Sequence, residues 1–208
     1  MYRMGMLKID HLVFATESLT EGLYFFEERL QVSFDEGGAH DQFGTHNKLL
    51  SLGDCYFELI AIDPQAPSPE RAIWYDLKTF SGSPRIITWV CETDRMSHHL
   101  TQAPYYAGEI LPLSRGALKW DLTVPDDGSL PMNGCAPSLI NWKGAASPAK
   151  RLPDRGCRLS SLTVYHPDPE KLGHFIYSKL KDPRIIFERS QKASLRVVIE
   201  TPKGLIEF

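Results

Sequence analysis

A repeated succession of strand and helix patterns is the feature that most constrains how this chain can fold. An apolar strand pattern at residues 9–14 leads into a helix pattern, and a second apolar strand pattern follows at 56–60. The same layout returns at the C-terminus, where the strand pattern 159–164 leads through a helix pattern to the last strand pattern at 204–208. Similarity at a fixed spacing is typical of a chain assembled from one supersecondary unit. The sequence therefore predicts copies of a β-α-β-β-β module.

The first and last copies can be aligned residue by residue. A shift of 150 positions places Leu12 on Leu162, and a shift of 149 places Glu58 on Glu207. A second, weaker copy lies between them. We therefore expect one α+β domain over residues 1–208, built of modules at about 5–63, 85–142 and 158–208.

Local signals place the elements of these modules. Ser18 and Glu21 form a capping box that predicts a helix to about Leu30. The glycines of segment 37–47 predict a loop. We expect further helices at 71–80, at 93–102 and after Pro169, a linker at 143–155, and strands at 6–14, 46–52, 55–61, 85–92, 107–113, 117–124, 137–142, 159–165, 184–188, 194–200 and 204–208.

Charge and composition exclude several classes of function. A net charge of -3 over 208 residues gives no general attraction to nucleic acid or to an anionic membrane. The longest apolar stretches are strand-sized, far short of the ~20 residues that a membrane-spanning helix needs. Residues 1–8 contain no signal-peptide core. We therefore expect a cytoplasmic protein without nucleic-acid or membrane partners.

Two polar residues interrupt the apolar strands of the first module. His11 shares a strand face with Ile9 and Val13, because strand side chains alternate with a period of two. Glu58 also lies between apolar neighbours, where an ionised carboxylate must be paired, hydrogen-bonded or bound to a metal. The structural alternatives are a hydrogen-bonded core histidine for His11 and, for Glu58, an ion pair with a basic residue or exposure on a solvated sheet face. Together, imidazole and carboxylate suit a divalent metal such as Zn, Fe, Ni or Mn.

Two further groups of residues are candidates for binding a small molecule. Glycines in segment 37–47 let the backbone approach a ligand, and His40 and Asn47 supply hydrogen-bonding side chains there. The alternative is a flexible hairpin loop whose polar residues face water. Trp89, Trp120 and Trp142, on later strand patterns, can line an apolar pocket or pack in the core.

The common cofactor and hydrolase signatures are absent from the sequence. It contains no G-x-G-x-x-G, P-loop, G-x-S-x-G or H-E-x-x-H motif. Its four cysteines form no C-x-x-C pair, which argues against a zinc-finger site. Cys55 and Cys91 lie in apolar strand patterns that favour buried thiols, and Cys157, beside Gly156, is a candidate for exposure.

Three segments carry a more specific combination of motifs. They are IDHLV at 9–13, GGAHDQFGTHN at 37–47 and YFELIAIDP at 56–64, followed by Trp89 and by PSLINW at 137–142. This combination resembles the glyoxalase-like domain family of the vicinal oxygen chelate superfamily, which includes glyoxalase I, extradiol dioxygenases, epimerases and fosfomycin- or bleomycin-resistance proteins. The resemblance implies a curved mixed sheet of paired modules around a cleft that can hold a divalent metal.

Carried over by position, the resemblance implies a metal site. Its ligands are His11, Glu58 and Glu207, and the fourth position falls on Ser161, where metal-binding members often have histidine. If module one pairs with module two, Glu207 leaves the site and Trp89 enters it. The substrate would chelate the metal through neighbouring oxygens, and the metal would stabilise an enolate or oxyanion.

Two functions from different classes follow. The first is a divalent-metal-dependent lyase, isomerase or dioxygenase acting on a small oxygenated molecule, with Glu58 and His40 as catalytic residues and Asn47, Trp89 and Trp120 binding the substrate. The second is a metal-free small-molecule-binding protein of the resistance type. Three modules leave one without an internal partner, so we also expect a homodimer.

Overall fold

The structure, a computed structural model, describes residues 6–69 and 71–208. Its first module consists of β1 (Lys8–Ala15), α1 (Leu19–Leu30), β2 (Asp35–His40), β3 (Thr45–Ser51) and β4 (Tyr56–Ile62). The helix begins as predicted, because the hydroxyl of Ser18 accepts a hydrogen bond from the amide of Glu21 at 3.3 Å.

The prediction of a loop over residues 37–47 is confirmed only for residues 41–44, the turn that contains Gly44 at a φ of 61°. Most of this segment forms the hairpin between β2 and β3, in which Gly38 pairs with Asn47. A Cβ atom on Gly37 would lie 2.0 Å from Oδ1 of Asn47. Gly37 therefore lets the strand backbone lie close to a neighbouring side chain, and it does not mark a turn.

The second module repeats this plan. It consists of η1 (Leu77–Thr79), β5 (Arg85–Glu92), α2 (Met96–Leu100), β6 (Glu109–Arg115), β7 (Leu118–Val124), η2 (Pro131–Gly134) and β8 (Ser138–Asn141). The helix predicted at 71–80 is reduced to the single short turn η1.

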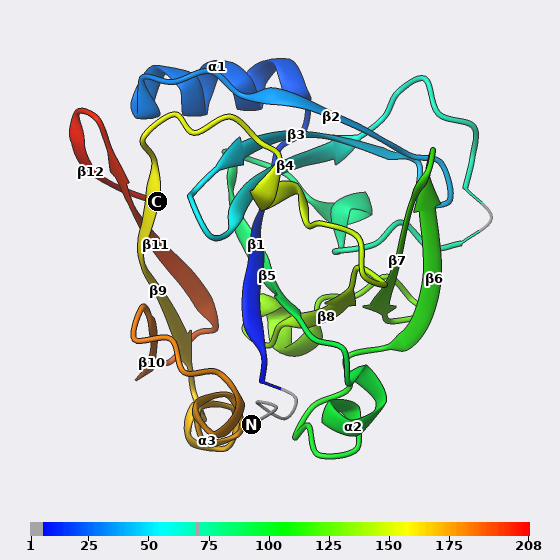
Figure 1. The fold of residues 1–208 in the computed structure, drawn as a ribbon, viewed down its shortest axis with the longest axis vertical. Coiled ribbons are helices and arrows are strands. Elements are labelled where there is room, and N and C mark those ends of the chain that lie inside the picture. The colour runs from blue at the N-terminus through cyan, green and yellow to red at the C-terminus, as the bar shows by residue number, and fades with distance from the viewer. Residues whose placement is uncertain (1–5, 70) are drawn as a thin grey trace.

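The two modules join in one eight-stranded sheet, with the order β2-β3-β4-β1-β5-β8-β7-β6. β1 pairs with β4 in parallel and with β5 antiparallel, so the first strands of the two modules form the seam. The sheet curls strongly, and its outermost strands β2 and β6 approach each other around a concave side (Figure 1). This is the curved mixed sheet that the sequence predicted.

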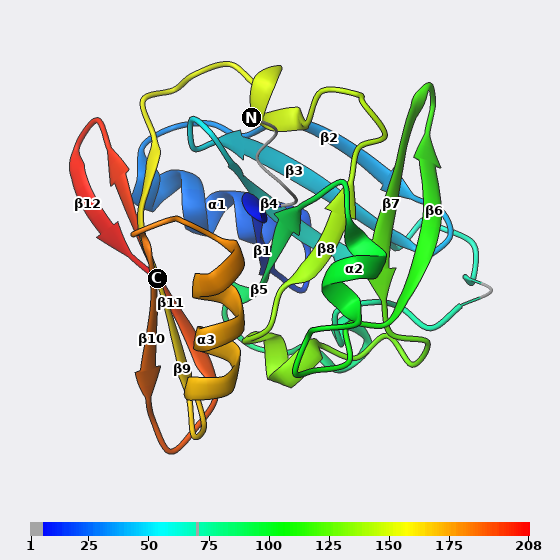
Figure 2. The same ribbon diagram turned by 60° about the horizontal axis from the view of Figure 1, so that its bottom comes forward.

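The third segment has a different topology. After η3 (Pro148–Lys150) it forms β9 (Arg158–His166), α3 (Glu170–Lys179), β10 (Ile185–Arg189), β11 (Ser194–Thr201) and β12 (Gly204–Glu207). These strands make a separate sheet with the order β10-β9-β11-β12, beside the larger one (Figure 2). In module one the last strand lies next to the first, whereas β12 lies at an edge. The alignment of Glu207 with Glu58 therefore does not hold in three dimensions.

Apolar side chains divide between the two faces of the large sheet. The convex side packs against α1 and the third segment in a core that includes Leu12, Phe14, Phe26, Phe57, Trp89 and Leu162. The concave side carries a second cluster that includes Val13, Ile60, Trp74, Trp120 and Trp142. The alternation of strand side chains produces this division, since Leu12 and Val13 are neighbours in sequence and belong to different clusters.

The third segment is fixed to the outside of the large sheet. The ring of Phe208 lies 5.1 Å from that of Phe26, and the guanidinium of Arg184 donates to both carboxylate oxygens of Asp54 at 2.8 Å. A module without an internal partner was the reason for expecting a homodimer. That reason does not apply, because the third segment packs against the rest of its own chain.

Two further sequence expectations concern chemistry and environment. All four cysteines are buried with free thiols. This confirms the prediction for Cys55 and Cys91, whereas the exposure considered for Cys157 was wrong. None of the helices in the described part of the chain has the length and apolarity needed to span a membrane.

Replacing the aromatic ring of Phe26 tests the packing of α1 on the convex core. Phe26 is fully buried, whereas Tyr24 on the same helix is 74% exposed. We expect Phe26→Ala to lower the free energy of unfolding by about 3–5 kcal/mol, because it leaves a cavity among the rings of Phe14 and Phe57. Tyr24→Ala, the matched control, should change it by less than about 0.5 kcal/mol. Equal losses in urea unfolding would contradict this packing.

Candidate functional site

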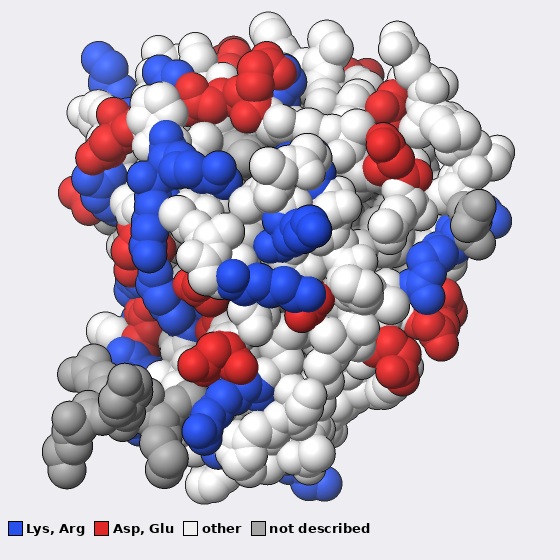
Figure 3. Space-filling model, turned by 45° about the vertical axis from the view of Figure 1, so that its right-hand side comes forward, with Lys and Arg blue, Asp and Glu red and all other residues white. Residues whose placement is uncertain are grey.

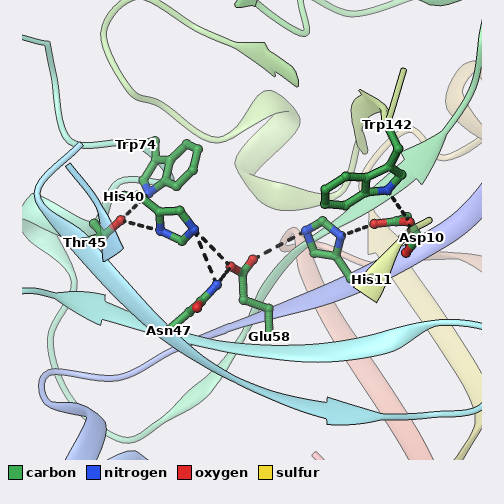
Figure 4. A network of polar contacts seen from close by, with 9 residues as sticks. Asp10, His11, His40, Thr45, Asn47, Glu58, Trp74 and Trp142 are labelled. Atoms are coloured by element: carbon green, nitrogen blue, oxygen red, sulfur yellow. Dashed lines mark hydrogen bonds and ion pairs between the residues drawn. The ribbon is translucent and has the colours of Figure 1, made fainter. Parts of the chain in front are cut away.

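Four neighbouring strands each contribute one polar side chain to the concave face. His11 lies on β1, Glu58 on β4, Asn47 on β3 and His40 at the end of β2 (Figure 4). Strand order places these four elements side by side, so residues up to 47 positions apart in sequence meet. The structure thus brings together four of the residues that the sequence singled out.

Glu58 is the centre of this group. It is 6% exposed, and its Oε2 atom lies 3.4 Å from Nε2 of His11. On the other side, Oε1 accepts a hydrogen bond from the side-chain amide of Asn47 at 2.5 Å and lies 4.0 Å from Nε2 of His40. Each carboxylate oxygen therefore has a partner, which is what burial of this charge requires.

Asp10 holds the far side of His11. The Nδ1 atom of His11 lies 2.7 Å from one oxygen of Asp10, and the other oxygen accepts from the indole of Trp142 at 2.9 Å and the hydroxyl of Ser147 at 2.8 Å. A register shift of β1 against β5 between Ile9 and His11 accompanies this contact between sequence neighbours. We did not single out Asp10 from the sequence, although an aspartate within an apolar strand was a usable signal.

The two carboxylates determine the charge state of His11. Burial by itself would lower the pKa of His11, but hydrogen bonds and charge interactions with Asp10 and Glu58 outweigh it and raise this pKa to about 9. Burial likewise favours neutral Glu58, yet His11, His40 and the amide of Asn47 lower its pKa to about 2. At neutral pH the pair is therefore an imidazolium and a carboxylate.

His40 has the opposite environment. Burial is the main cause that lowers the pKa of His40 to about 4; the positive charges of Arg115 and His11 add to this effect, and the charge of Glu58 opposes it. His40 is therefore neutral at neutral pH. The two histidines on either side of Glu58 differ in charge.

Hydrogen bonds fix the orientation of the neutral His40 ring. Its Nδ1 atom lies 3.1 Å from the hydroxyl of Thr45, which also accepts from the indole of Trp74. The amide of Gly38 donates to Oδ1 of Asn47 at 2.8 Å, so that the Nδ2 group of Asn47 points to Glu58 and, at 3.4 Å, to Nε2 of His40. This arrangement leaves the unprotonated Nε2 of His40 beside the carboxylate.

An outer pocket and a small inner chamber adjoin each other beside this group. The outer part has a volume of about 430 Å³ and opens between the β6–β7 hairpin and the end of β2. An inner chamber of about 30 Å³, with room for a group the size of a water molecule, is lined by His11, His40, Asn47 and Glu58. Four residues line both parts and separate them: His40, Trp74, Arg115 and Trp120.

The tryptophans are distributed differently from the prediction. Trp120 and Trp142 line the cavity as expected and Trp74 joins them, but Trp89 does not. Trp89 belongs to the convex core, where its indole donates to the carbonyl of Cys135 at 3.0 Å. Its predicted role in substrate binding was wrong, because its side chain points to the other face of the sheet. Trp74 lies in an irregular segment whose sequence gave no signal of its position.

Glu207 does not join His11 and Glu58. It lies on β12 in the second sheet, where its side chain is 61% exposed and 3.9 Å from Arg196. The predicted ligand set His11, Glu58 and Glu207 is therefore not assembled. The pairing of module one with module two, which the sequence left open, excludes Glu207 from the concave face.

The side chains present do not fit the divalent metal that the resemblance implies. His11 and Glu58 are two adjacent donors, but no group of three His, Cys, Asp or Glu side chains within residues 6–69 and 71–208 is placed to hold a metal ion. From module two, the inner chamber receives apolar side chains such as Ile140 and Trp142, and the cation Arg115. A resident catalytic metal commonly has three protein ligands.

Histidine-ring NMR tests the assigned charge states. We expect His11 to lose its proton near pH 9 and His40 to gain one only near pH 4. By linkage, the stability that the His11 pairing contributes is present below its ordinary pKa of 6.5 and is lost as the pH rises through 9. Glu58→Gln should lower the pKa of His11, because it removes a charged acceptor. Two histidines titrating together near 6.5 would contradict the assignment.

Comparisons with known proteins agree with this architecture. The model of the glyoxalase-like domain family matches residues 9–180. No curated protein matches the sequence. A solved structure titled as a hypothetical protein from Staphylococcus aureus is 14% identical, covers 98% of this chain and 99% of its own, and has a TM-score of 0.66.

Other solved structures are similar over about two thirds of the chain. A hypothetical protein from Bacillus halodurans is 16% identical over 67% of this chain and 97% of its own, with a TM-score of 0.46. Methylmalonyl-CoA epimerase from Mycobacterium tuberculosis is 16% identical over 68% and 91%, with a TM-score of 0.45. At these identities the likenesses concern the fold alone. Because the family model matches most of this chain, the chain belongs to the glyoxalase-like domain family of the vicinal oxygen chelate superfamily.

Proposed function

We propose that this protein is an enzyme that transfers protons on a small oxygenated organic molecule, as an isomerase or a lyase. The observation that carries the proposal is the position of Glu58 between His11 and His40, in a chamber that adjoins the larger cavity. Proton transfer from carbon needs a base, a group that stabilises the resulting negative charge, and protection from water. Glu58 and His11 supply the first two, and the burial of both side chains limits their contact with water.

Glu58 and His40 are the proposed proton acceptors. The carboxylate and the unprotonated Nε2 of His40 lie 4.0 Å apart and face the same small space. The two histidines beside Glu58 have pKa values shifted in opposite directions, to about 9 for His11 and about 4 for His40, and groups whose pKa values are pushed apart in this way are typical of acid–base sites. His11, whose pKa is raised to about 9, supplies the positive charge that stabilises an enolate oxygen next to the carbon that loses its proton.

The proposed step conserves atoms and charge. A proton leaves a carbon next to a carbonyl group and passes to Glu58 or His40, while the electron pair moves onto the carbonyl oxygen as an enolate. Return of the proton to the other face or to a neighbouring carbon gives an isomer. Expulsion of a leaving group from the adjacent carbon gives a lyase reaction. No step requires a metal, which agrees with the donor set of the site.

A metal-free binding protein is the second candidate, and one observation favours it. Glu58 is already paired on both oxygens, and its pKa is lowered to about 2, which makes it a weak base until a ligand displaces His11 or Asn47. In this alternative the same cavity holds a small molecule without converting it.

Proton exchange with solvent separates the two candidates. Pyruvate, 2-oxobutyrate and phenylpyruvate are incubated with the protein in D₂O, and the loss of the proton signal next to the carbonyl is followed by NMR. We expect catalysed exchange with at least one of them. Glu58→Gln should slow it by about 100-fold or more, because it removes the base while preserving the shape of the side chain.

The controls use residues that the structure places in and out of the site. Glu207→Gln makes the same chemical change on the second sheet and should leave exchange unaltered. His40→Gln should slow exchange at neutral pH. Exchange by Glu58→Gln at the rate of the unaltered protein would refute the role of Glu58. Tight binding of these acids without any exchange would favour the binding protein.

A further inference from the structure

Arg115 occupies an unusual place in the curled sheet. It is the last residue of β6, at one edge, yet its side chain reaches the opposite edge at β2. A Cβ atom on Gly38 would lie 2.7 Å from Cδ and 2.9 Å from Nη1 of Arg115. The side chain of Arg115 therefore lies directly against the backbone at Gly38. A residue with a Cβ atom at position 38 would displace it from this place.

The guanidinium of Arg115 lacks a counter-ion among the residues that the structure describes. Its Nη1 atom is buried and has no hydrogen-bond partner there. Other arginines of this chain are paired: Arg184 with Asp54 and Asp182, and Arg155 with Asp35. Burying part of a charged group without a partner costs free energy. An arginine held in this way is suited to receive an anion that enters the cavity.

The position of Arg115 relates that anion to the proposed chemistry. Arg115 lines both the outer cavity and the inner chamber, together with His40, Trp74 and Trp120. An anionic group bound at this boundary would leave the adjoining carbon facing the chamber that contains Glu58. Arg115 thus lies where a substrate can be held by its anionic end while another part of the molecule reaches the chamber.

Aromatic side chains that are largely buried line the cavity next to Arg115. The rings of Phe43 and Trp74 are stacked, with centroids 4.0 Å apart and an angle of 5° between their planes. Trp120 forms another wall of the cavity and is 6% exposed. Planar molecules make extended contact with such surfaces, whereas puckered rings of similar size do not.

The charges facing the cavity favour a carboxylate over a dianion. Arg115 is the cation that lines the outer cavity, and Asp41 lines it as well. A guanidinium binds either a carboxylate or a phosphate through two parallel hydrogen bonds. The negative charge of Asp41 opposes a second negative charge on the ligand. On the surface that includes the β6–β7 side, Lys and Arg side chains lie near the middle of the face (Figure 3), where they attract anions.

We propose that Arg115 binds the carboxylate of the substrate, and that the substrate is a small planar carboxylic acid, either aromatic or conjugated. This inference rests on the proposed function for the statement that the bound molecule reacts. The binding itself does not depend on turnover.

Binding of benzoate, an unreactive planar carboxylate, tests the proposal. Three of the four tryptophans of the chain line the cavity, so their fluorescence reports occupancy, and calorimetry gives the affinity. We expect benzoate to bind the full-length protein, and benzamide, the neutral molecule of the same shape, to bind about 10-fold or more weakly. Cyclohexanecarboxylate, which is not planar, should also bind more weakly than benzoate.

Variants of Arg115 identify the residue responsible. Arg115→Met should weaken benzoate binding by about 10-fold or more without changing the weak binding of benzamide. Arg115→Lys, which keeps the charge but loses the planar fork, should fall between the two. Arg189→Met, the matched control on the exposed strand β10, should bind benzoate as the unaltered protein does. If melting shows that Arg115→Met does not fold, the lysine variant carries the comparison.

Several outcomes would overturn the proposal. These are equal benzoate affinity in the unaltered protein and Arg115→Met, equal affinity for benzoate and benzamide, or no benzoate binding at all. Displacement of benzoate by inorganic phosphate at lower concentration would also overturn the choice of carboxylate. Benzoate binding that depends on Arg115, together with absence of proton exchange, would support this inference and refute the proposed enzyme activity, so the two failures can be told apart.

Discussion

A carboxylate buried on the concave face of the sheet must be paired, and the rest of the site follows from this requirement. Glu58 has His11 on one oxygen and Asn47 on the other. His11 in turn needs Asp10, whose second oxygen takes hydrogen bonds from Trp142 and Ser147. These partners lie on β1, on β3 and in the segment after β8, so the network also ties β1 and β4 to that segment. A change at any member leaves a buried charge short of a partner.

Much of the fold could be predicted from local patterns, because the strands and α1 carry clear periodicity and capping signals. Strand order could not. The alignment of Glu207 with Glu58 followed sequence spacing, but spacing does not determine which strands become neighbours, and β12 lies at the edge of a separate sheet. The prediction that Trp89 binds the substrate was wrong for a related reason. Alternation along the strand places the side chain on one of the two faces of the sheet, but only the packing of the third segment shows which face lines the cavity.

The candidate site was predictable to the extent that its residues stood out in their own strands. His11 and Glu58 interrupt apolar runs, and His40 and Asn47 lie in a glycine-rich segment, so all four could be singled out. Trp74 and Arg115 had no such signal, since their place in the cavity depends on the curl that brings β6 to β2. The predicted metal site is an ion pair in the structure for a similar reason. Its third predicted ligand, Glu207, depended on a strand pairing that does not form.

The central claim is that His11 and Glu58 form an ion pair beside neutral His40, where the resemblance implied a metal centre. The most direct test is a crystal structure of the protein soaked in MnCl₂, with an anomalous difference map calculated at the concave face. The account predicts no anomalous peak between Nε2 of His11 and the carboxylate of Glu58, and a distance between them close to the present 3.4 Å. A strong peak at about 2.0–2.2 Å from both atoms, the usual range for metal ligands, would contradict it.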